Sequence, residues 1–167
     1  KSECPSSVDV AALKAEFQYQ YQKENGKSLR SKIFANNGKM NGLASKTPVI
    51  ANFFFKNSVA SGIAKKIMGV APERTLPILA KQTLANYYQK NKSRFQIENP
   101  IKTVYFFNDE FTNFLDSEIG VDALELLYKL NYRVEFVKHE ESGRSYISKG
   151  FLEEAKVFVD KNVSIFK

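Results

Sequence analysis

The sequence contains one thiol, Cys4, which stands directly before Pro5. A helix is expected to begin just after it, because Ser6 or Ser7 is a suitable N-cap ahead of a periodic apolar run. A thiolate near a helix N-terminus is stabilised by the backbone dipole and by unpaired N–H groups, which favours reactivity or metal binding. The alternative is an ordinary small residue near the chain end, and the Cys-Pro pair by itself does not decide between the two.

A second set of polar side chains follows two expected strands. Asp109 and Glu110 come after the first strand, and His139, Glu140 and Glu141 come after the second. Sites in open α/β sheets form beyond the carboxyl ends of the strands, so both groups should lie at one sheet edge. Three interpretations remain open. They are solvent-exposed loop ends, a zinc or hard-metal site built on His139 and the carboxylates, and a pocket for an organic substrate or docking partner lined by Asp109, Glu141, Ser142, Gly143 and Arg144.

These strands belong to a strand–helix–strand–helix pattern over residues 101–167. Strands are predicted at 102–109 and 132–139, with a helix over 116–131 between them that is capped by Asp116 or Ser117. Because a crossover helix joins the strands, they should be parallel. Residues 140–146 are predicted as a loop and 148–166 as a helix. Two apolar stripes should face a core: Ile119, Ala123, Leu126, Leu127 and Leu130, and Leu152, Ala155, Val159, Val163 and Phe166.

The first hundred residues indicate helices and loops. Helices are predicted over 8–23, with Val10, Leu13, Phe17 and Tyr21 on one face and a stop at Asn25-Gly26, and over 28–36, with a stop at Asn37-Gly38. One or two apolar helices are expected within 51–68, and a short helix with a linker within 79–95. The predicted fold class is therefore α+β or α/β, with a mainly helical half at 1–100 and a small βαβα unit with parallel strands at 101–167.

Composition excludes several classes of protein. With 43% hydrophobic residues the chain can bury a core, and no apolar run approaches the roughly 18 residues of a membrane-spanning helix. A single cysteine excludes an internal disulfide and favours a reducing compartment. The net charge of +7 would suit nucleic acid, an anionic membrane face or an acidic partner. The basic residues are scattered and no nucleic-acid-binding motif accompanies them, so no nucleic-acid partner is expected.

Longer stretches of the chain resemble a known family. Residues 1–34, KSECPSSVDVAALKAEFQYQYQKENGKSLRSKIF, are similar to the region after the second ferredoxin-type cluster motif of large FAD-linked oxidases with an iron–sulfur module, of the D-lactate dehydrogenase and glycolate oxidase type. GVAPERTLP (69–77) adds to the match. FFNDEFTNFLDSEIGVDALELL (106–127) and GRSYISKGFLEEAK (143–156) resemble the cysteine-rich CCG domain of glycolate oxidase iron–sulfur subunits and heterodisulfide reductases.

The resemblance implies cofactors and ligands. Cys4 would be the last ligand of a [4Fe–4S] cluster whose other thiolates lie upstream, and FAD would be bound outside this chain. The family's CCGRP motif falls on Glu141, Ser142, Gly143, Arg144 and Ser145, so both of its cysteines are replaced. Cluster ligation by this part of the chain is therefore not expected, and what remains is a scaffold in which Gly143 forms a tight loop before a helix.

On this resemblance the chain is a non-catalytic piece of a larger enzyme. Residues 1–100 would form the tail of a ferredoxin-like domain with a connector, and 101–167 part of a CCG-like unit. The enzyme would oxidise a lactate- or glycolate-type 2-hydroxy acid and pass electrons to a quinone or carrier. Partners would be other domains of the same chain, in the cytoplasm or peripherally at the inner membrane face. The alternatives are a non-redox adaptor with a basic docking surface and, more remotely, a small nucleic-acid binder.

Overall fold

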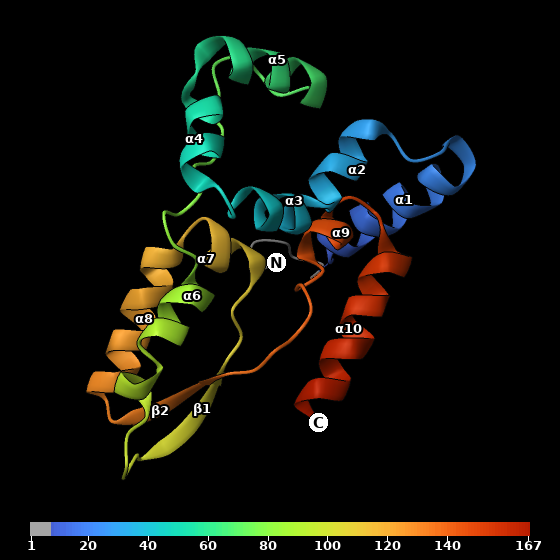
Figure 1. Cartoon of the computed structure of the whole chain (residues 1–167). Coiled ribbons are helices and arrows are strands. Elements are labelled where there is room, and N and C mark those ends of the chain that lie inside the picture. The colour runs from blue at the N-terminus through green and yellow to red at the C-terminus, as the bar shows by residue number, and fades with distance from the viewer. Residues whose placement is uncertain (1–7) are drawn as a thin grey trace. The chain divides into compact units, whose positions relative to one another are not determined.

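The structure, a computed structural model, describes residues 8–167. It confirms the predicted fold class, because the described chain is mainly helical and carries one small parallel sheet (Figure 1). The chain divides into two compact units, each of which is described by itself. Unit 1 combines the residues up to Asn37 with Ser142–Lys167, and unit 2 is Gly38–Glu141. The family-based division at residue 100 stays a prediction, and the compact units follow a different division.

Unit 1 is built from four helices of the described chain: α1 (Val10–Asn25), α2 (Leu29–Ala35), α9 (Arg144–Ser148) and α10 (Leu152–Phe166). Helix α1 is capped by Asp9, whose side chain accepts the N–H of Ala12 at 3.1 Å, and Ser6 and Ser7 lie outside the described residues. Gly26 ends α1 as predicted, with φ 81°. Residues 144–146 were predicted as part of a loop, but they begin helix α9, which follows directly from the left-handed turn at Gly143 (φ 76°).

The core of unit 1 lies between α2, α9 and α10. Ala35, Tyr146, Phe151 and Ala155 are buried there, and the Tyr146 hydroxyl donates to Asn36 Oδ1 at 2.9 Å. Helix α10 packs within this unit, on α9 and α1. Its predicted apolar stripe is covered only in part: Ala155 is buried, while Val159, Val163 and Phe166 are each more than 40% exposed.

The apolar face that the sequence marks on α1 is not the side that packs on unit 1. Val10, Leu13, Phe17 and Tyr21 are all exposed. The opposite side faces the unit, where Ala15 is buried and the Gln22 side-chain amide donates to the Lys149 carbonyl at 2.7 Å. Gly150 permits this arrangement, because a Cβ there would lie 2.7 Å from Gln18 Cβ and 2.8 Å from the α1 backbone. A close backbone approach thus decides which side of α1 is covered.

Unit 2 opens with three helices. They are α3 (Asn37–Ala44), which begins at the boundary between the units, α4 (Pro48–Lys56) and α5 (Ser58–Met68). One or two apolar helices were predicted within 51–68, and the structure has two, although α4 begins earlier, at Pro48, a favoured first helical residue. Asn37-Gly38 was expected to end a helix and instead begins α3, because the chain already turns at Asn36.

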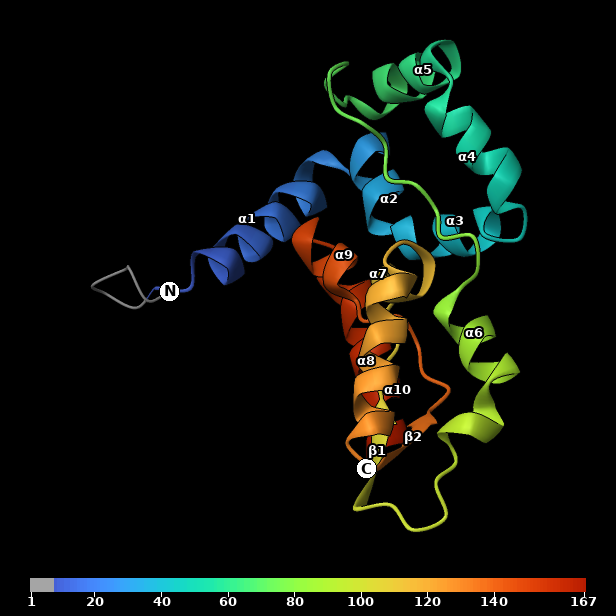
Figure 2. The same cartoon turned by 90° about the vertical axis from the view of Figure 1, so that its left-hand side faces the viewer.

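The sheet and its covering helices form the core of unit 2 (Figure 2). The elements are α6 (Leu84–Lys90), the 3₁₀ turn η1 (Lys92–Phe95), β1 (Lys102–Phe106), α7 (Glu110–Phe114), α8 (Ser117–Lys129) and β2 (Tyr132–Phe136). The two strands pair in parallel with Val104 opposite Val134, as predicted. Tyr88 stacks on Phe136 at 4.1 Å between ring centroids, and its hydroxyl donates to the Val134 carbonyl at 2.8 Å.

The predicted apolar stripe of α8 faces the core only in part, through Leu127. Ile119, Leu126 and Leu130 are more than half exposed, while Leu124 is fully buried. Leu84 packs against Gly120, where a Cβ would lie 2.2 Å from Leu84 Cδ2. The helix is apolar on more than one side, and the missing side chain at Gly120 selects the side that α6 covers.

Candidate functional site

The carboxyl ends of the two strands meet at one edge of unit 2, as predicted from the sequence. The backbone N–H of Asn108, just after β1, donates to His139 Nε2, just after β2, at 3.1 Å. The Phe107 ring stacks on the imidazole with centroids 3.9 Å apart. The strand ends are therefore held together by direct contacts.

His139 serves as a connector at this edge. Its Nε2 accepts the Asn108 N–H, so the ring proton belongs on Nδ1, which lies 2.6 Å from the Glu140 carbonyl oxygen and donates to it. Both ring nitrogens are thus engaged with backbone groups. The zinc interpretation finds no support in residues 8–167, where no group of three or more His, Cys, Asp or Glu side chains is arranged to hold a metal ion.

Asp109 has a structural task. One carboxylate oxygen accepts the N–H groups of Phe111 and Thr112, at 2.9 and 2.8 Å, and so caps α7. This short helix was not predicted. It brings the next residue, Glu110, into the interior, where its side chain is 95% buried.

Glu141 occupies the space left by Gly38. A Cβ on Gly38 would fall 2.7 Å from the Glu141 carboxyl carbon, so the carboxyl group rests on the first turn of α3. Partial burial raises the pKa of Glu141, the charges of Glu110 and then Glu140 add to the rise, and Lys39 opposes it. Glu141 therefore binds a proton more tightly than a free carboxyl group, and the carboxyl group of Glu110 beside it is buried.

Ser142, Gly143 and Arg144 belong to unit 1. The Ser142 hydroxyl accepts the Arg144 N–H at 3.3 Å, and Gly143 adopts the left-handed conformation that starts α9. Arg144 is exposed and lines a hollow of about 250 Å³ together with Lys14 and Ile147. The predicted pocket residues are therefore divided, with Asp109 and Glu141 in unit 2 and the other three in unit 1. Their role as a pocket remains a prediction.

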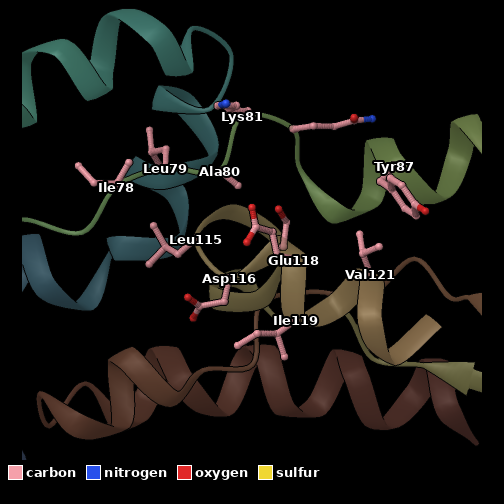
Figure 3. A pocket seen from close by; sticks show the side chains of 12 residues that line it. Ile78, Leu79, Ala80, Lys81, Tyr87, Leu115, Asp116, Glu118, Ile119 and Val121 are labelled. Atoms are coloured by element: carbon pink, nitrogen blue, oxygen red, sulfur yellow. The ribbon is translucent and has the colours of Figure 1, made fainter. Parts of the chain in front are cut away.

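Unit 2 contains a hollow that the sequence did not indicate. It measures about 610 Å³ and lies between the 78–82 segment and the start of α8. Figure 3 shows Ile78 and Leu79 on one side, Asp116 and Glu118 on the other, and Tyr87 at one end. Its border carries two carboxylates, Asp116 and Glu118, and one amine, Lys81. The sequence signal was faint, because the 78–82 segment belongs to no helix or strand.

Cys4, the predicted cluster ligand, lies outside the described residues. Residues 8–167 contain no cysteine, so this part of the chain supplies no thiolate set for an iron–sulfur cluster. None of the helices within residues 8–167 combines the length and apolar character needed to cross a membrane.

Over about nine-tenths of its length the chain is similar to 2-hydroxy acid dehydrogenases. The relatives are D-2-hydroxyglutarate dehydrogenases of Pantoea ananatis (27% identical over 161 residues, 91% of this chain), Escherichia coli (24% over 157 residues, 90%) and Haemophilus influenzae (25% over 158 residues, 90%). The chain spans 15–16% of the length of these proteins. No protein-family model and no solved structure matches it.

Proposed function

We propose that this chain is a structural part of a larger FAD- and iron–sulfur-dependent oxidoreductase that oxidises a 2-hydroxy acid. The observation that carries the proposal is the similarity of some nine-tenths of the chain to three proteins named D-2-hydroxyglutarate dehydrogenase. The same similarity makes D-2-hydroxyglutarate the first substrate to test, ahead of the lactate and glycolate suggested by the wider resemblance.

The proposed reaction converts the secondary alcohol of the substrate into a ketone. The C2–H and O–H bonds break, a C=O bond forms, and two electrons and two protons leave the 2-hydroxy acid to give a 2-oxo acid. FAD would accept both electrons, and iron–sulfur clusters would pass them singly to a quinone or other carrier. The proposal assigns FAD and the other cluster ligands to the larger protein, since the resemblance places FAD outside this chain and residues 8–167 carry no thiolate.

Within that protein, the described residues would act as a scaffold. Asp109 caps a helix, His139 joins the two strand ends, and Gly143 turns the chain into α9. Each of these side chains or backbone turns holds a local structure, and this supports a positioning role. In the proposal, Cys4 completes a [4Fe–4S] cluster with thiolates outside the chain, and Glu141 and Ser142 stand where the family has its cysteine pair.

The second candidate function is a non-redox adaptor. The net charge of +7 and the exposed apolar side chains of α4 and α5 favour it. An adaptor would need no cofactor, so cofactor content separates the two candidates. Cytoplasmic or peripheral membrane location remains a prediction under either one.

The test uses the intact gene product with the 167-residue chain as control. Flavin, iron and acid-labile sulfide are quantified, and reduction of an artificial electron acceptor is followed with D-2-hydroxyglutarate, D-lactate and glycolate. We expect flavin, iron and turnover in the intact protein and none in the chain alone. Cys4→Ser should lower the iron content by about one cluster, that is by about four iron atoms per protein. An intact product without flavin and iron contradicts the proposal and favours the adaptor.

A further inference from the structure

Helices α4 and α5 turn their large apolar side chains outward. On α4, Val49, Ile50, Phe53 and Phe54 are exposed, and on α5, Val59, Ile63 and Ile67 are exposed, each by at least 54%. The spacing of the α5 residues, at i, i+4 and i+8, places them on one helical face. Soluble monomers rarely expose a contiguous apolar patch larger than a few hundred Å², and larger patches mark interaction sites.

Small and polar side chains take the inward positions instead. Ser61 is 94% buried on α5. On α4, Asn52 holds the helix by a pair of hydrogen bonds to buried Leu79, donating to its carbonyl and accepting its N–H, both at 2.8 Å. Burying polar groups while seven large apolar residues face water is unfavourable for a free surface. The hydrogen bonds to Leu79 therefore hold Phe53 and Phe54 in position for a partner.

Gly62 lies about halfway along α5, exposed and beside the apolar stripe of Val59, Ile63 and Ile67. No atom lies within 4 Å of the position that its Cβ would occupy, and its φ is not in the left-handed region. Nothing in the described residues requires a glycine here, although glycine in a helix interior costs about 1 kcal/mol relative to alanine. A partner backbone that approaches α5 closely would require it.

The charge of this segment limits the kinds of partner surface that it can bind. Residues 38–72 contain Lys39, Lys46, Lys56, Lys65 and Lys66 and no Asp or Glu. Two copies of this segment would repel each other, which disfavours self-pairing. Residues 48–68 contain no Trp or Tyr, the residues enriched where proteins meet the lipid headgroup level. The surface therefore fits a protein partner with an apolar centre and carboxylates at its border.

We propose that the exposed face of α4 and α5, defined by the seven apolar residues above together with Gly62, docks on an acid-bordered apolar surface of the remaining part of the same larger protein. This inference rests on the proposed function. The relatives supply such a remainder, since this chain spans only 15–16% of their length. Figures 1 and 2 show α4 and α5 as consecutive helices of unit 2.

The experiment compares amide hydrogen exchange of residues 48–68 in the intact protein and in the chain alone. Docking predicts exchange at least about tenfold slower in the intact protein, because local opening then requires release of the partner. Gly62→Leu should return the rate to within about twofold of the chain alone, since the leucine blocks close approach. In the chain alone the same substitution meets open space, so its melting temperature should be equal or higher.

Gln89→Leu is the matched control, because it places the same side chain at an exposed position of α6 outside the proposed face. It should leave the slow exchange of residues 48–68 intact. A photo-crosslinker at Phe53 should in addition join to a peptide outside these 167 residues.

Three results would overturn the inference. They are equal exchange in the intact protein and the chain alone, slow exchange of the chain alone that appears as its concentration rises, and slow exchange that appears with phosphatidylglycerol vesicles alone. The second result indicates a second copy and the third a lipid surface. Cofactor content and turnover are independent readouts. An active enzyme with unprotected α4 and α5 refutes docking alone, whereas protected helices in a cofactor-free intact protein refute the proposed oxidoreductase.

Discussion

The Glu141 carboxyl group lies over the Cα of Gly38, so close that a Cβ on Gly38 would come within 2.7 Å of its carboxyl carbon. The two residues are about a hundred positions apart in sequence, yet both lie in unit 2. The contact connects the carboxyl end of the sheet to the first turn of α3, and it removes the advantage that alanine would otherwise have over glycine in a helix.

Gly38→Ala tests this contact, with Gly62→Ala as the control. At Gly62, where the space is open, alanine should stabilise the protein by about 0.5–1 kcal/mol. At Gly38 the same gain should be cancelled, because the Glu141 side chain must move, so the net change should lie within about 0.5 kcal/mol of zero. Urea denaturation gives both values. In a Glu141→Ala background, Gly38→Ala should recover the gain seen at Gly62, and equal gains at both sites in the wild-type background would contradict the contact.

Glu141 should also make unit 2 less stable as the pH rises. Its pKa is raised above the ordinary value of 4.5, so the folded state binds its proton more tightly than the unfolded state. The stability that this provides is complete below the unfolded pKa and is lost as the pH rises through the folded pKa. Glu141→Gln should remove that loss.

The pH test compares wild type and Glu141→Gln by urea denaturation at pH 4 and pH 7. The variant should gain stability relative to wild type at pH 7, by no more than about 1 kcal/mol because the group is half exposed, and should gain less at pH 4. Glu98→Gln, at an exposed position of unit 2 outside its helices and strands, serves as a control for loss of a surface charge. If wild type instead became more stable relative to Glu141→Gln between pH 4 and pH 7, the prediction of a raised pKa at Glu141 would be wrong.

Gly150→Ala should destabilise unit 1 strongly. The residue has φ 73°, and a Cβ there would lie 2.8 Å from the backbone of α1, which cannot move aside as a side-chain end can. Gly26→Ala is the matched control, with φ 81° but no atom within 4 Å of the added Cβ. We expect a loss of about 1–2 kcal/mol at Gly26 from backbone strain and about 3 kcal/mol or more at Gly150. Equal losses in thermal or urea unfolding would mean that α1 does not pack on Gly150.

Tyr88→Phe should destabilise unit 2 by about 1–1.5 kcal/mol, because it removes a buried hydrogen bond to the Val134 carbonyl and keeps the ring stack. Tyr87→Phe is the comparison. Its hydroxyl makes a longer contact, 3.4 Å to Glu125, and the loss should stay within about 0.5 kcal/mol. A smaller loss at Tyr88 than at Tyr87 would place the Tyr88 hydroxyl outside the core.

Much of the fold follows from the sequence, for identifiable reasons. The β-rich runs beginning at Lys102 and Tyr132 and the intervening apolar helix specify a parallel pair, because a crossover of that length allows no tight hairpin. Helix α9 was missed because one turn and a half carries no periodic signal. The short helix α7 was missed for the same reason, although its cap, Asp109, was noticed as a polar residue after a strand.

Which side of a helix is covered could not be predicted from periodicity. Helix α8 carries apolar residues on several sides. Helix α1 exposes its apolar face, which runs from Val10 to Tyr21. Gly120 and Gly150 decide the packing through close approaches, and such contacts appear only when the partner element is placed. For the site, the meeting of the two strand ends at one edge followed from the rule on parallel strands, whereas the hydrogen bond between Asn108 and His139 was not predicted. The separation of Glu141 from Arg144 into different units depends on long-range packing that no local pattern contains.

The most direct test of the account is the absorbance of the intact protein during anaerobic addition of D-2-hydroxyglutarate. The account predicts a bound flavin whose oxidised band bleaches on addition of the acid, with no such band in the 167-residue chain. An intact protein that contains no flavin, or whose flavin stays oxidised with D-2-hydroxyglutarate, D-lactate and glycolate alike, would contradict it.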